Sequence, residues 1–272
     1  MIFAVLERKW MTHMTKNLLL AAGIAALGLL AETTRAASQY WDTSASDGIQ
    51  GGNGSWSTTD AYWSPSATPV GSPLSPWANG NDAQFVTPAS GGPSTILVTN
   101  SVTAGLVSTA GSSVYNLIVT NGGTLLVYAG GVTVGYFTTG HTVIVSGPGS
   151  ILASTNTSAP TLKIGDASGV PSRSFNLLRV ENGGVVSNLN VWVGPLSQCD
   201  GSGVIVTSGG KVYGQMTVGY NNYSNSVSIT GGNGVQSLWN CMNTTVGINA
   251  GPQAYSRHSL RIDGAGYDGS AV

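Results

Sequence analysis

A four-residue pattern recurs along the second half of the chain. Its first and third residues are mostly apolar, its second residue varies, and its fourth is a glycine. It reads VTVG at 132–135, LKIG at 162–165, VWVG at 191–194, MTVG at 216–219 and TTVG at 244–247, so its glycines lie 25 to 30 residues apart. Alternation of period two predicts short strands. A fixed period of this size is typical of stacked repeats, in which each unit buries its apolar side chains only against its neighbours.

A second alternating phrase interleaves with the first and also ends in a glycine turn. It reads LIVTNGG at 117–123, LRVENGG at 178–184 and VIVTSGG at 204–210, with variants at 143–150, 227–232 and 260–266. Each cycle should therefore hold at least two short strands, with glycine supplying the positive-φ corners. Helical spacing is absent after residue 37. The two phrases together predict an all-β fold, a parallel β-helix of about five to six coils that begins near residue 95.

Residues 37–100 differ from the repeats of 101–272. Four of the seven tryptophans fall there (Trp41, Trp56, Trp63 and Trp77), among prolines that interrupt any long strand. One interpretation is an aromatic platform for a sugar. The other, which we expect, is an N-terminal cap whose large side chains cover the open end of the first coil. At the other end the chain stops in mid-phrase after 260–266, as the first part of a longer product would.

Charged residues are scarce, and this scarcity limits the kinds of partner that the chain can bind. Only 8% of the 272 residues are charged, against roughly 25% in typical domains. The 41% of hydrophobic residues distinguishes the chain from disordered sequence. After residue 36 there are six basic and nine acidic side chains. This balance argues against a nucleic-acid partner, whose phosphates require clustered Lys and Arg.

Residues 1–36 are expected to be a signal peptide. A basic start with Arg8, Lys9 and Lys16 precedes an apolar run at 18–31 that is short for a membrane span. Small residues at Thr34 and Ala36 predict cleavage after Ala36. We expect an exported mature chain without an integral membrane segment; a retained anchor is the alternative. The choice among Met1, Met11 and Met14 as the start stays open.

Two cysteines, Cys199 and Cys241, follow the signal peptide. An exported pair can form a disulfide. The two residues occupy different phases of the repeat, so the sequence favours neither a bridge nor two unpaired thiols. Metal binding is not expected there, because no His or Cys lies at ligand spacing nearby.

The two phrases, over roughly residues 114–268, resemble the repeat shared by autotransporter passengers and PEP-CTERM-sorted bacterial proteins. The segment 41–85 resembles the Trp-rich opening of autotransporter-associated β-strand repeat proteins. The resemblance implies a right-handed parallel β-helix and a structural role at a bacterial surface or outside the cell. The chain departs from both families because it shows neither a translocator barrel nor a Pro-Glu-Pro tail, which leaves the secretion route open.

Polysaccharide lyases and hydrolases also use parallel β-helices, so charged candidates have to be weighed. The last apolar residue before each glycine turn is here called the anchor residue. In two repeats an arginine stands directly before the anchor and an acid directly after it: Arg179 and Glu181 in one, Arg261 and Asp263 in the other. The anchor residues are Val119, Val145, Val180, Val206, Ile229 and Ile262. Since side chains at i and i+2 of a strand share a face, each Arg should lie beside its own acid, away from the core. A basic–acidic groove is the functional interpretation; an exposed ion pair is the one we expect.

Other polar residues also have a structural explanation. The corner position, four places before each anchor, holds His141, Asn176, Ser202, Asn225 and His258. We expect Asn and Ser there to bond their own backbone, and the histidines to be polar corner residues or members of a hydrogen-bonded ladder rather than bases. Asp166, Asp200 and Asp268 lie in glycine-rich turns but lack the repeated Gly-Gly-x-Gly-x-Asp of calcium-binding repeats. Tyr136, Phe137, Tyr220 and Tyr223 are expected to stack between coils, with glycan binding as the alternative.

These patterns predict an exported protein of the bacterial surface with a structural or adhesive role. No residue is assigned a catalytic, cofactor-binding or metal-binding role, and no cofactor is expected. Surface glycans, other cell-surface proteins and a second copy joined end to end are the partners considered. The alternative is a polysaccharide-active enzyme or carbohydrate-binding module. The ligand and the anchor stay open.

Overall fold

The structure is a computed structural model that describes residues 36–89, 92–111, 113–136, 138–156, 158, 160–166, 175–195, 201–220, 224–231, 235–240, 243–248 and 258–263. The chain divides into two compact units, Met1–Ala36 and Ala37–Val272. The described residues belong almost entirely to the second unit, and all of their regular elements are strands.

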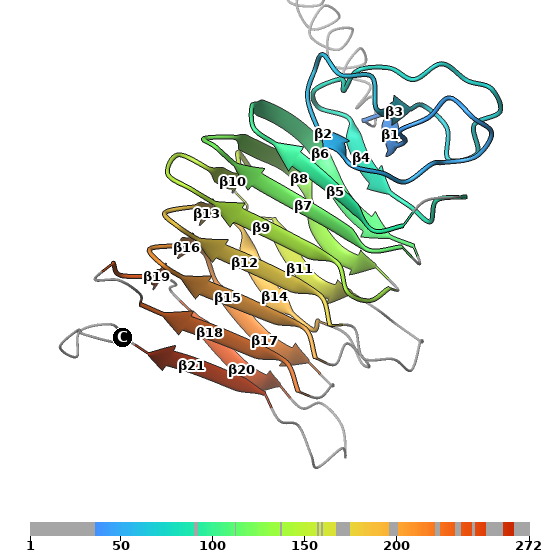
Figure 1. Ribbon diagram of the computed structural model, residues 1–272. Coiled ribbons are helices and arrows are strands. Elements are labelled where there is room, and N and C mark those ends of the chain that lie inside the picture. Colours follow the sequence, from blue (N-terminus) through green and yellow to red (C-terminus); the bar gives the residue numbers. More distant parts are fainter. Residues whose placement is uncertain are drawn as a thin grey trace, which may run out of the picture. The chain divides into compact units, whose positions relative to one another are not determined.

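One sheet of the described chain contains eight parallel strands (Figure 1). Its strands are β2 (Gly54–Ser55), β5 (Ser94–Val98), β7 (Tyr115–Thr120), β9 (Thr142–Ser146), β12 (Leu177–Glu181), β15 (Gly203–Thr207), β18 (Ser226–Thr230) and β21 (Ser259–Asp263). From β7 onward, each strand pairs with its equivalent one repeat later, and not with the strand that follows it in the chain. This connectivity is the one that a repeating coil requires.

The second sheet is organised around two long strands, β6 (Ser101–Ala110) and β8 (Thr124–Tyr136), which pair along their lengths. The first half of β8 pairs with β10 and its second half with β11, so the later strands form two branches. One branch contains β10 (Ile151–Ser154), β13 (Val185–Ser187), β16 (Lys211–Tyr213) and β19 (Leu238–Asn240). The other contains β11 (Thr161–Asp166), β14 (Asn190–Val193), β17 (Met216–Tyr220) and β20 (Thr244–Ile248).

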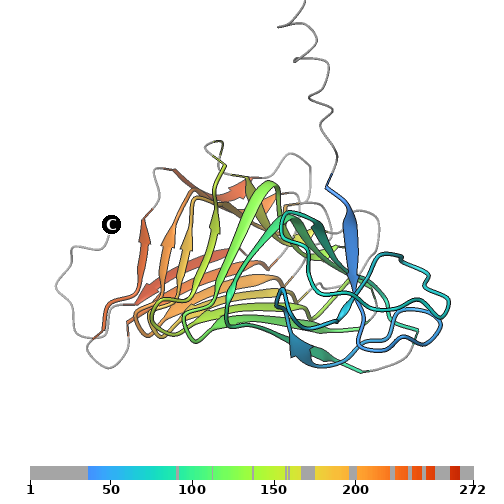
Figure 2. The same cartoon turned by 90° about the horizontal axis from the view of Figure 1, so that it is seen from above.

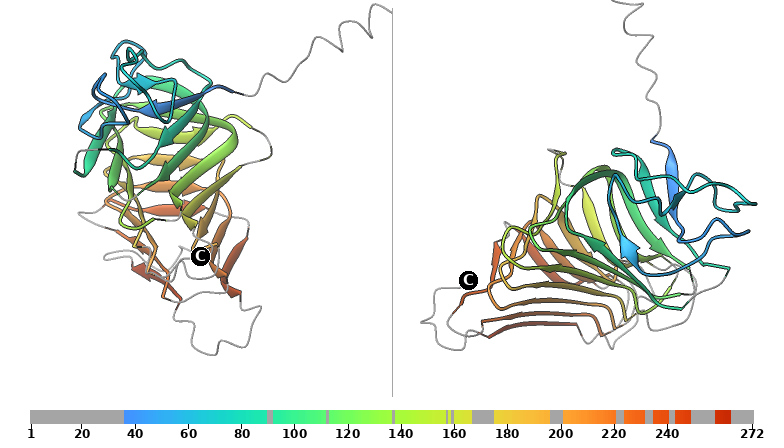
Figure 3. Two further views of the ribbon diagram at one scale, coloured as in Figure 1. Left: turned by 90° about the vertical axis from the view of Figure 1, so that its right-hand side faces the viewer. Right: turned by 45° about the horizontal axis from the view of Figure 1, so that its top comes forward.

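Each repeat after β8 therefore contributes three strands, one to the eight-stranded sheet and one to each branch (Figure 2). Strands of successive repeats lie one above another in both views of Figure 3. All pairings among these repeat strands are parallel. This all-β arrangement is consistent with a parallel β-helix.

Apolar side chains of successive strands form columns inside the coil. The register pairs Val119 with Val145, Val145 with Val180 and Val180 with Val206, and all four side chains are buried. The same series continues through Ile229, which is buried, and in register through Ile262 of β21, which is 52% exposed. The alignment of anchor residues predicted from the sequence is therefore the register of the sheet. It arises because period-two alternation sends every second side chain inward.

Glycine supplies a left-handed corner in these turns, as predicted, and the Asn or Ser before it, which was not predicted, is left-handed as well. Asn121 and Gly122 have φ angles of 54° and 77°, and the Gly123 N–H donates to the Thr120 carbonyl at 2.9 Å. The second glycine of the pair is needed for another reason. An added Cβ at Gly123 would lie 2.0 Å from the carbonyl oxygen of Val98 on the preceding coil.

The N-terminal segment, residues 37–89, has a core of aromatic rings. Its strands are β1 (Ser38–Trp41), β3 (Trp63–Ser64), β4 (Asp82–Phe85) and β2 of the eight-stranded sheet. The Trp63 ring lies 4.5 Å from Trp77 and 5.0 Å from Trp56, centroid to centroid, and all three side chains are buried. Trp41 is buried as well. Because these rings present no open face, the sugar-platform interpretation is wrong.

Candidate functional site

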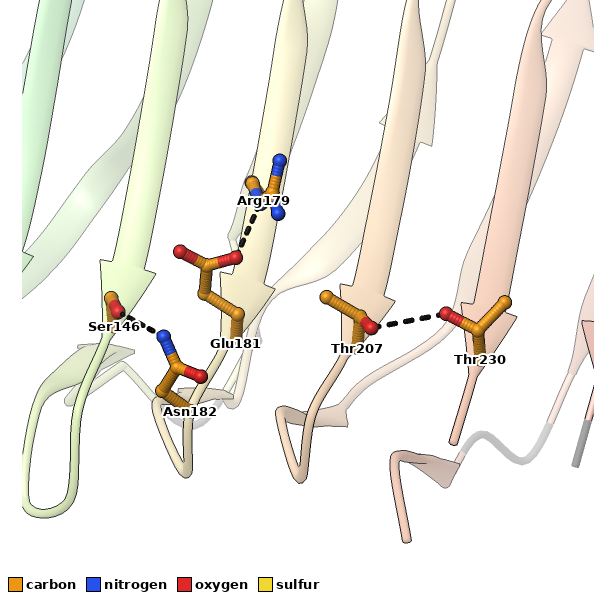
Figure 4. Close-up of polar contacts among 6 residues, drawn as sticks. All are labelled: Ser146, Arg179, Glu181, Asn182, Thr207 and Thr230. Atoms are coloured by element: carbon orange, nitrogen blue, oxygen red, sulfur yellow. Dashed lines mark hydrogen bonds and ion pairs between the residues drawn. The ribbon is translucent and has the colours of Figure 1, made fainter. Parts of the chain in front are cut away.

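The outward face of the eight-stranded sheet carries the charged residues that the sequence singled out. Alternation directs Arg179 and Glu181 of β12 away from the buried Val180. The Arg179 Nε donates to the Glu181 Oε2 (Figure 4). On β21, an Arg261 guanidinium nitrogen lies 2.6 Å from the Asp263 Oδ2. The predicted pairing of each Arg with its own acid is therefore confirmed.

The neighbours of Arg179 in the adjacent strands are Ile144 and Ile205. The register therefore places no second charged side chain directly beside the guanidinium. A lyase needs an unpaired base, and a glycosidase needs two opposed carboxylates. The contacts of Arg179 match neither arrangement.

Neutral polar side chains near this pair are also joined to one another. The Asn182 Nδ2 donates to the Ser146 Oγ at 3.1 Å, and the Thr230 Oγ1 donates to the Thr207 Oγ1 at 3.1 Å (Figure 4). Both bonds connect neighbouring coils. These two bonds, one from the turn after β12 to β9 and one from β18 to β15, help to hold the stack together.

The corner position forms a buried series of hydrogen bonds. The side chains of His141, Asn176, Ser202 and Asn225 are all buried. The Asn176 Oδ1 accepts from the His141 N–H at 2.9 Å, and the Asn225 Oδ1 accepts from the Ser202 N–H at 3.0 Å. The expectation that Asn bonds its own backbone is wrong, because each amide side chain accepts from the backbone of the coil before it. The expectation of a ladder is met in part: its donors are backbone amides, and it is interrupted at Ser202, whose buried Oγ has no hydrogen-bond partner.

His141 is held in its neutral form by this environment. Its Nδ1 accepts from the Tyr115 N–H at 3.2 Å, so its proton lies on Nε2, which is 2.6 Å from the Thr138 Oγ1. Burial lowers the pKa of His141 to about 4, against the opposing effect of a hydrogen bond with the Gly111 backbone. A buried ring with both nitrogens engaged fits the predicted polar corner residue.

The glycine that closes the first phrase is fitted to the corner position of the next coil. Gly135 has a φ of 76°, and an added Cβ would lie 2.1 Å from the Asn176 side-chain nitrogen. Gly219 stands in the same relation to His258, at 2.2 Å. The two sequence phrases therefore meet in space, at the corners of adjacent coils.

Asp166, the described member of the three aspartates in glycine-rich turns, forms an ion pair. Asp166 is buried, and its Oδ2 lies 2.8 Å from the Lys163 Nζ. Within the described part of the chain, no group of three or more His, Cys, Asp or Glu side chains is placed to hold a metal ion. The sequence analysis missed the Lys163–Asp166 pair. The feature of the sequence that indicates this pair is Gly165, which is left-handed and interrupts the alternation between Lys163 and Asp166.

Several candidates fall outside the described residues, namely Asp200, Asp268, Cys199, Cys241, Phe137 and Tyr223, together with the side chain of Tyr220. Tyr136 is exposed at the end of β8. The choice between stacking and glycan binding for this aromatic set therefore stays a prediction.

A buried acid that the sequence analysis did not single out lies in the N-terminal segment. Asp42 is fully buried, and its Oδ1 accepts from the backbone N–H groups of Ser44 and Gln50 at 3.2 and 3.0 Å. Burial raises the pKa of Asp42, while its backbone hydrogen bonds lower it. These bonds fix the loop after β1, which is a structural role.

Comparison with known proteins finds a distant similarity to the adhesin BmaC autotransporter of Brucella suis biovar 1 (strain 1330). The two are 24% identical over 227 residues, which is 83% of this chain and 6% of that protein. The chain matches none of the protein-family models and no solved structure. The described residues include no helix long and apolar enough to cross a membrane.

Proposed function

We propose that the protein is an exported bacterial repeat protein with a structural or adhesive role at the cell surface or outside the cell, and without catalytic activity. The observation that carries the proposal is the continuous parallel stack, which displays long, nearly uncharged faces instead of one convergent site. Many weak contacts along such a face add up when they act together. The similarity to an autotransporter adhesin, although it spans a small part of that protein, supports the same role.

The finer architecture belongs to this proposal. The stack is a right-handed β-helix of about five to six coils, and residues 37–100 form its N-terminal cap. Three facts support the cap: its aromatic core is buried, β2 pairs with β5, and β4 pairs with β6. Residues 1–36 are the signal peptide, and the protein is related to autotransporter passengers or PEP-CTERM-sorted proteins. Surface glycans or cell-surface proteins are its partners.

The non-catalytic part of the proposal rests on what the candidate groups already do. Arg179 and Arg261 are paired with acids of their own strands, and His141 is buried and neutral. None of these three side chains is available as a base in its present contacts. The same reasoning assigns no catalytic, cofactor-binding or metal-binding residue.

The role is tested with the full-length chain secreted by a bacterial host. Antibody labelling of intact cells measures display, and adhesion of cells or protein-coated beads to bacterial and eukaryotic cell surfaces measures binding. Cells carrying the empty vector and beads coated with urea-unfolded protein are the controls. Adhesion at the level of both controls, with no labelling at the surface, would overturn the proposal.

The polysaccharide-active alternative is tested on the same preparation. Release of reducing or unsaturated sugar ends is followed on neutral and acidic polysaccharides, with wild type and Arg179→Ala compared. We expect no turnover by either protein. Robust turnover that disappears in Arg179→Ala would replace the structural role with an enzymatic one.

A further inference from the structure

The first coils of the eight-stranded sheet display a regular outward surface, which we call the aliphatic–hydroxyl strip. Its central column is Leu97, Ile118 and Ile144, which the register places side by side on β5, β7 and β9. Two residues back along β7 and β9, Asn116 pairs with Thr142 in the same outward orientation. On the other side of the column stands Thr120. The strip is therefore an aliphatic row with Asn116 and Thr142 on one side and Thr120 on the other, where Ser146, the register partner of Thr120, is bonded to Asn182.

The strip is open to solvent and its polar groups are not engaged. Leu97 is 38% exposed, and the other five side chains are partly exposed. The side chains of Asn116, Thr120 and Thr142 make no hydrogen bond to any other described residue. The later coils differ, because there Arg179 pairs with Glu181 and Thr230 with Thr207. The unengaged polar groups that flank the aliphatic column thus lie on β7 and β9, although Ser228 on β18 also makes no hydrogen bond to a described residue.

The size of the strip argues against a second copy of the chain as its occupant. Three strands about 4.8 Å apart, with three outward positions each, give a surface on the order of 200 Å². A stable protein–protein interface buries roughly 800 Å² on each partner. The strip is smaller than the exposed apolar patches that mark binding surfaces by their size, so binding is inferred from the regular register of its side chains.

The chemistry of the strip specifies the occupant. None of its six side chains is charged, so it offers nothing to an acidic or basic ligand. Its occupant must present C–H groups along its centre and hydroxyl groups along its edges. An extended neutral polysaccharide has this pattern, and one pyranose unit is comparable in length to the spacing between coils.

We propose that the aliphatic–hydroxyl strip binds a neutral polysaccharide that runs across β5, β7 and β9, with one sugar unit above each strand. The C–H faces of the sugars pack on Leu97, Ile118 and Ile144. Their hydroxyl groups exchange hydrogen bonds with Asn116, Thr120 and Thr142. This inference rests on the proposed adhesive function and names the ligand class of its binding face.

The competing surface is the exposed Trp192 on β14, whose register neighbours are Lys163 and Thr217. Trp192 is a single ring, and the Lys163 beside it is already paired with Asp166. Single exposed apolar residues are common on ordinary surfaces and need no ligand to explain them. The strip, with three aliphatic neighbours in register, is the better candidate.

The experiment is affinity electrophoresis of the full-length protein in gels that contain hydroxyethylcellulose, xyloglucan or dextran as neutral probes. Gels with polygalacturonate or alginate test the acidic alternative. We expect retardation by at least one neutral polymer, unchanged between 50 mM and 500 mM NaCl because no ion pair forms. The acidic polymers should leave the mobility unchanged.

The key variant is Ile118→Asp, with Ile205→Asp as its matched control, because Ile205 occupies the same outward column on β15. Ile118→Asp should weaken retardation at least tenfold, while Ile205→Asp and Trp192→Ala should remain within twofold of wild type. Far-ultraviolet circular dichroism checks the fold. If Ile118→Asp does not fold, the pair Thr120→Val and Thr142→Val replaces it, with the same expected loss.

Retardation by acidic polymers alone, by no polymer at all, or equally in Ile118→Asp and wild type would overturn the inference. Loss of retardation in Trp192→Ala, with Ile118→Asp unaffected, would assign the site to β14 instead. Adhesion of coated beads is measured in parallel. Beads that adhere equally with wild type and Ile118→Asp reject the strip and leave the adhesive function standing, whereas absent adhesion rejects the adhesive function itself.

Discussion

The N-terminal segment and the repeats that follow bury their apolar side chains in different ways. In residues 37–89, a few large rings pack on one another, with Trp63 in contact with Trp41, Trp56, Trp77 and Phe85. In the repeats, small branched side chains such as Val145 and Val180 stack in register between adjacent coils. One core depends on individual side chains and the other on a repeated backbone geometry. Substitutions should therefore act through side-chain volume in the first region and through backbone fit in the second.

The sharpest test of this contrast is Trp63→Ala against Val180→Ala. Trp63→Ala empties the centre of the aromatic cluster and should lower the free energy of unfolding by about 3–5 kcal/mol. Val180→Ala removes two methyl groups and should cost about 2 kcal/mol. Urea unfolding followed by circular dichroism measures both. Equal losses would mean that the two regions share one packing mode.

One contribution to the pH dependence of stability should come from a repeat corner. The unfolded chain protonates His141 with an ordinary pKa near 6.5, whereas the folded chain does so only near pH 4. The unfolded state binds more protons between these values, so stability is complete above pH 6.5 and is lost as pH falls toward 4. The loss should reach about 3 kcal/mol.

The control for this prediction is His141→Asn, since Asn176 and Asn225 already accept a backbone hydrogen bond at the equivalent corner. The variant keeps an acceptor and removes the titrating ring. Unfolding midpoints between pH 4 and 7 should therefore vary less in His141→Asn than in wild type. Parallel pH profiles for the two proteins would reject this account of His141.

Two adjacent glycines separate backbone conformation from close approach. Gly123→Ala places a Cβ against the Val98 carbonyl oxygen and should cost about 1–3 kcal/mol. Gly122→Ala has a left-handed φ of 77° but open space around it, and should cost about 1 kcal/mol. Thermal unfolding of the two variants makes the comparison. A larger loss at Gly122 would show that strain, and not stacking distance, dominates these turns.

The smallest effect is expected on the outward face. Arg179→Ala breaks a partly exposed ion pair and should change the free energy of unfolding by about 0–1 kcal/mol. Glu181→Gln is the companion variant, and raised salt should reduce the difference from wild type. A loss above 2 kcal/mol in urea unfolding would mean that this pair supports the stack as the columns do.

Much of the coil could be predicted from the sequence because it repeats. The anchor residues from Val119 to Ile262 are in register because their alternation admits one inward face, and each positive-φ glycine follows from a corner that branched residues resist. The third strand of each repeat could not be predicted from the sequence. Strands such as β13 and β16 have three residues, too few for alternation to be distinguished from a turn.

The site was predicted only where the partners are close in sequence. Arg179 and Glu181 share a strand, so their pairing followed from period two. The bond from His141 to Asn176 crosses coils whose connection varies in length, and nothing local indicates that an amide side chain reaches the preceding coil. The free polar groups of the aliphatic–hydroxyl strip could not be recognised either, because a pattern of residues does not tell which hydroxyls are already bonded.

The fit of Gly135 to Asn176, and of Gly219 to His258, bears on how such a gene can grow. Tandem duplication lengthens a protein of this kind, but each breakpoint joins the end of one cycle to the start of another. A duplicated segment preserves the corner only when the bulky corner residue of one coil again lies against a glycine of the adjacent coil. Duplications of whole cycles satisfy this condition automatically, and those of other lengths do not.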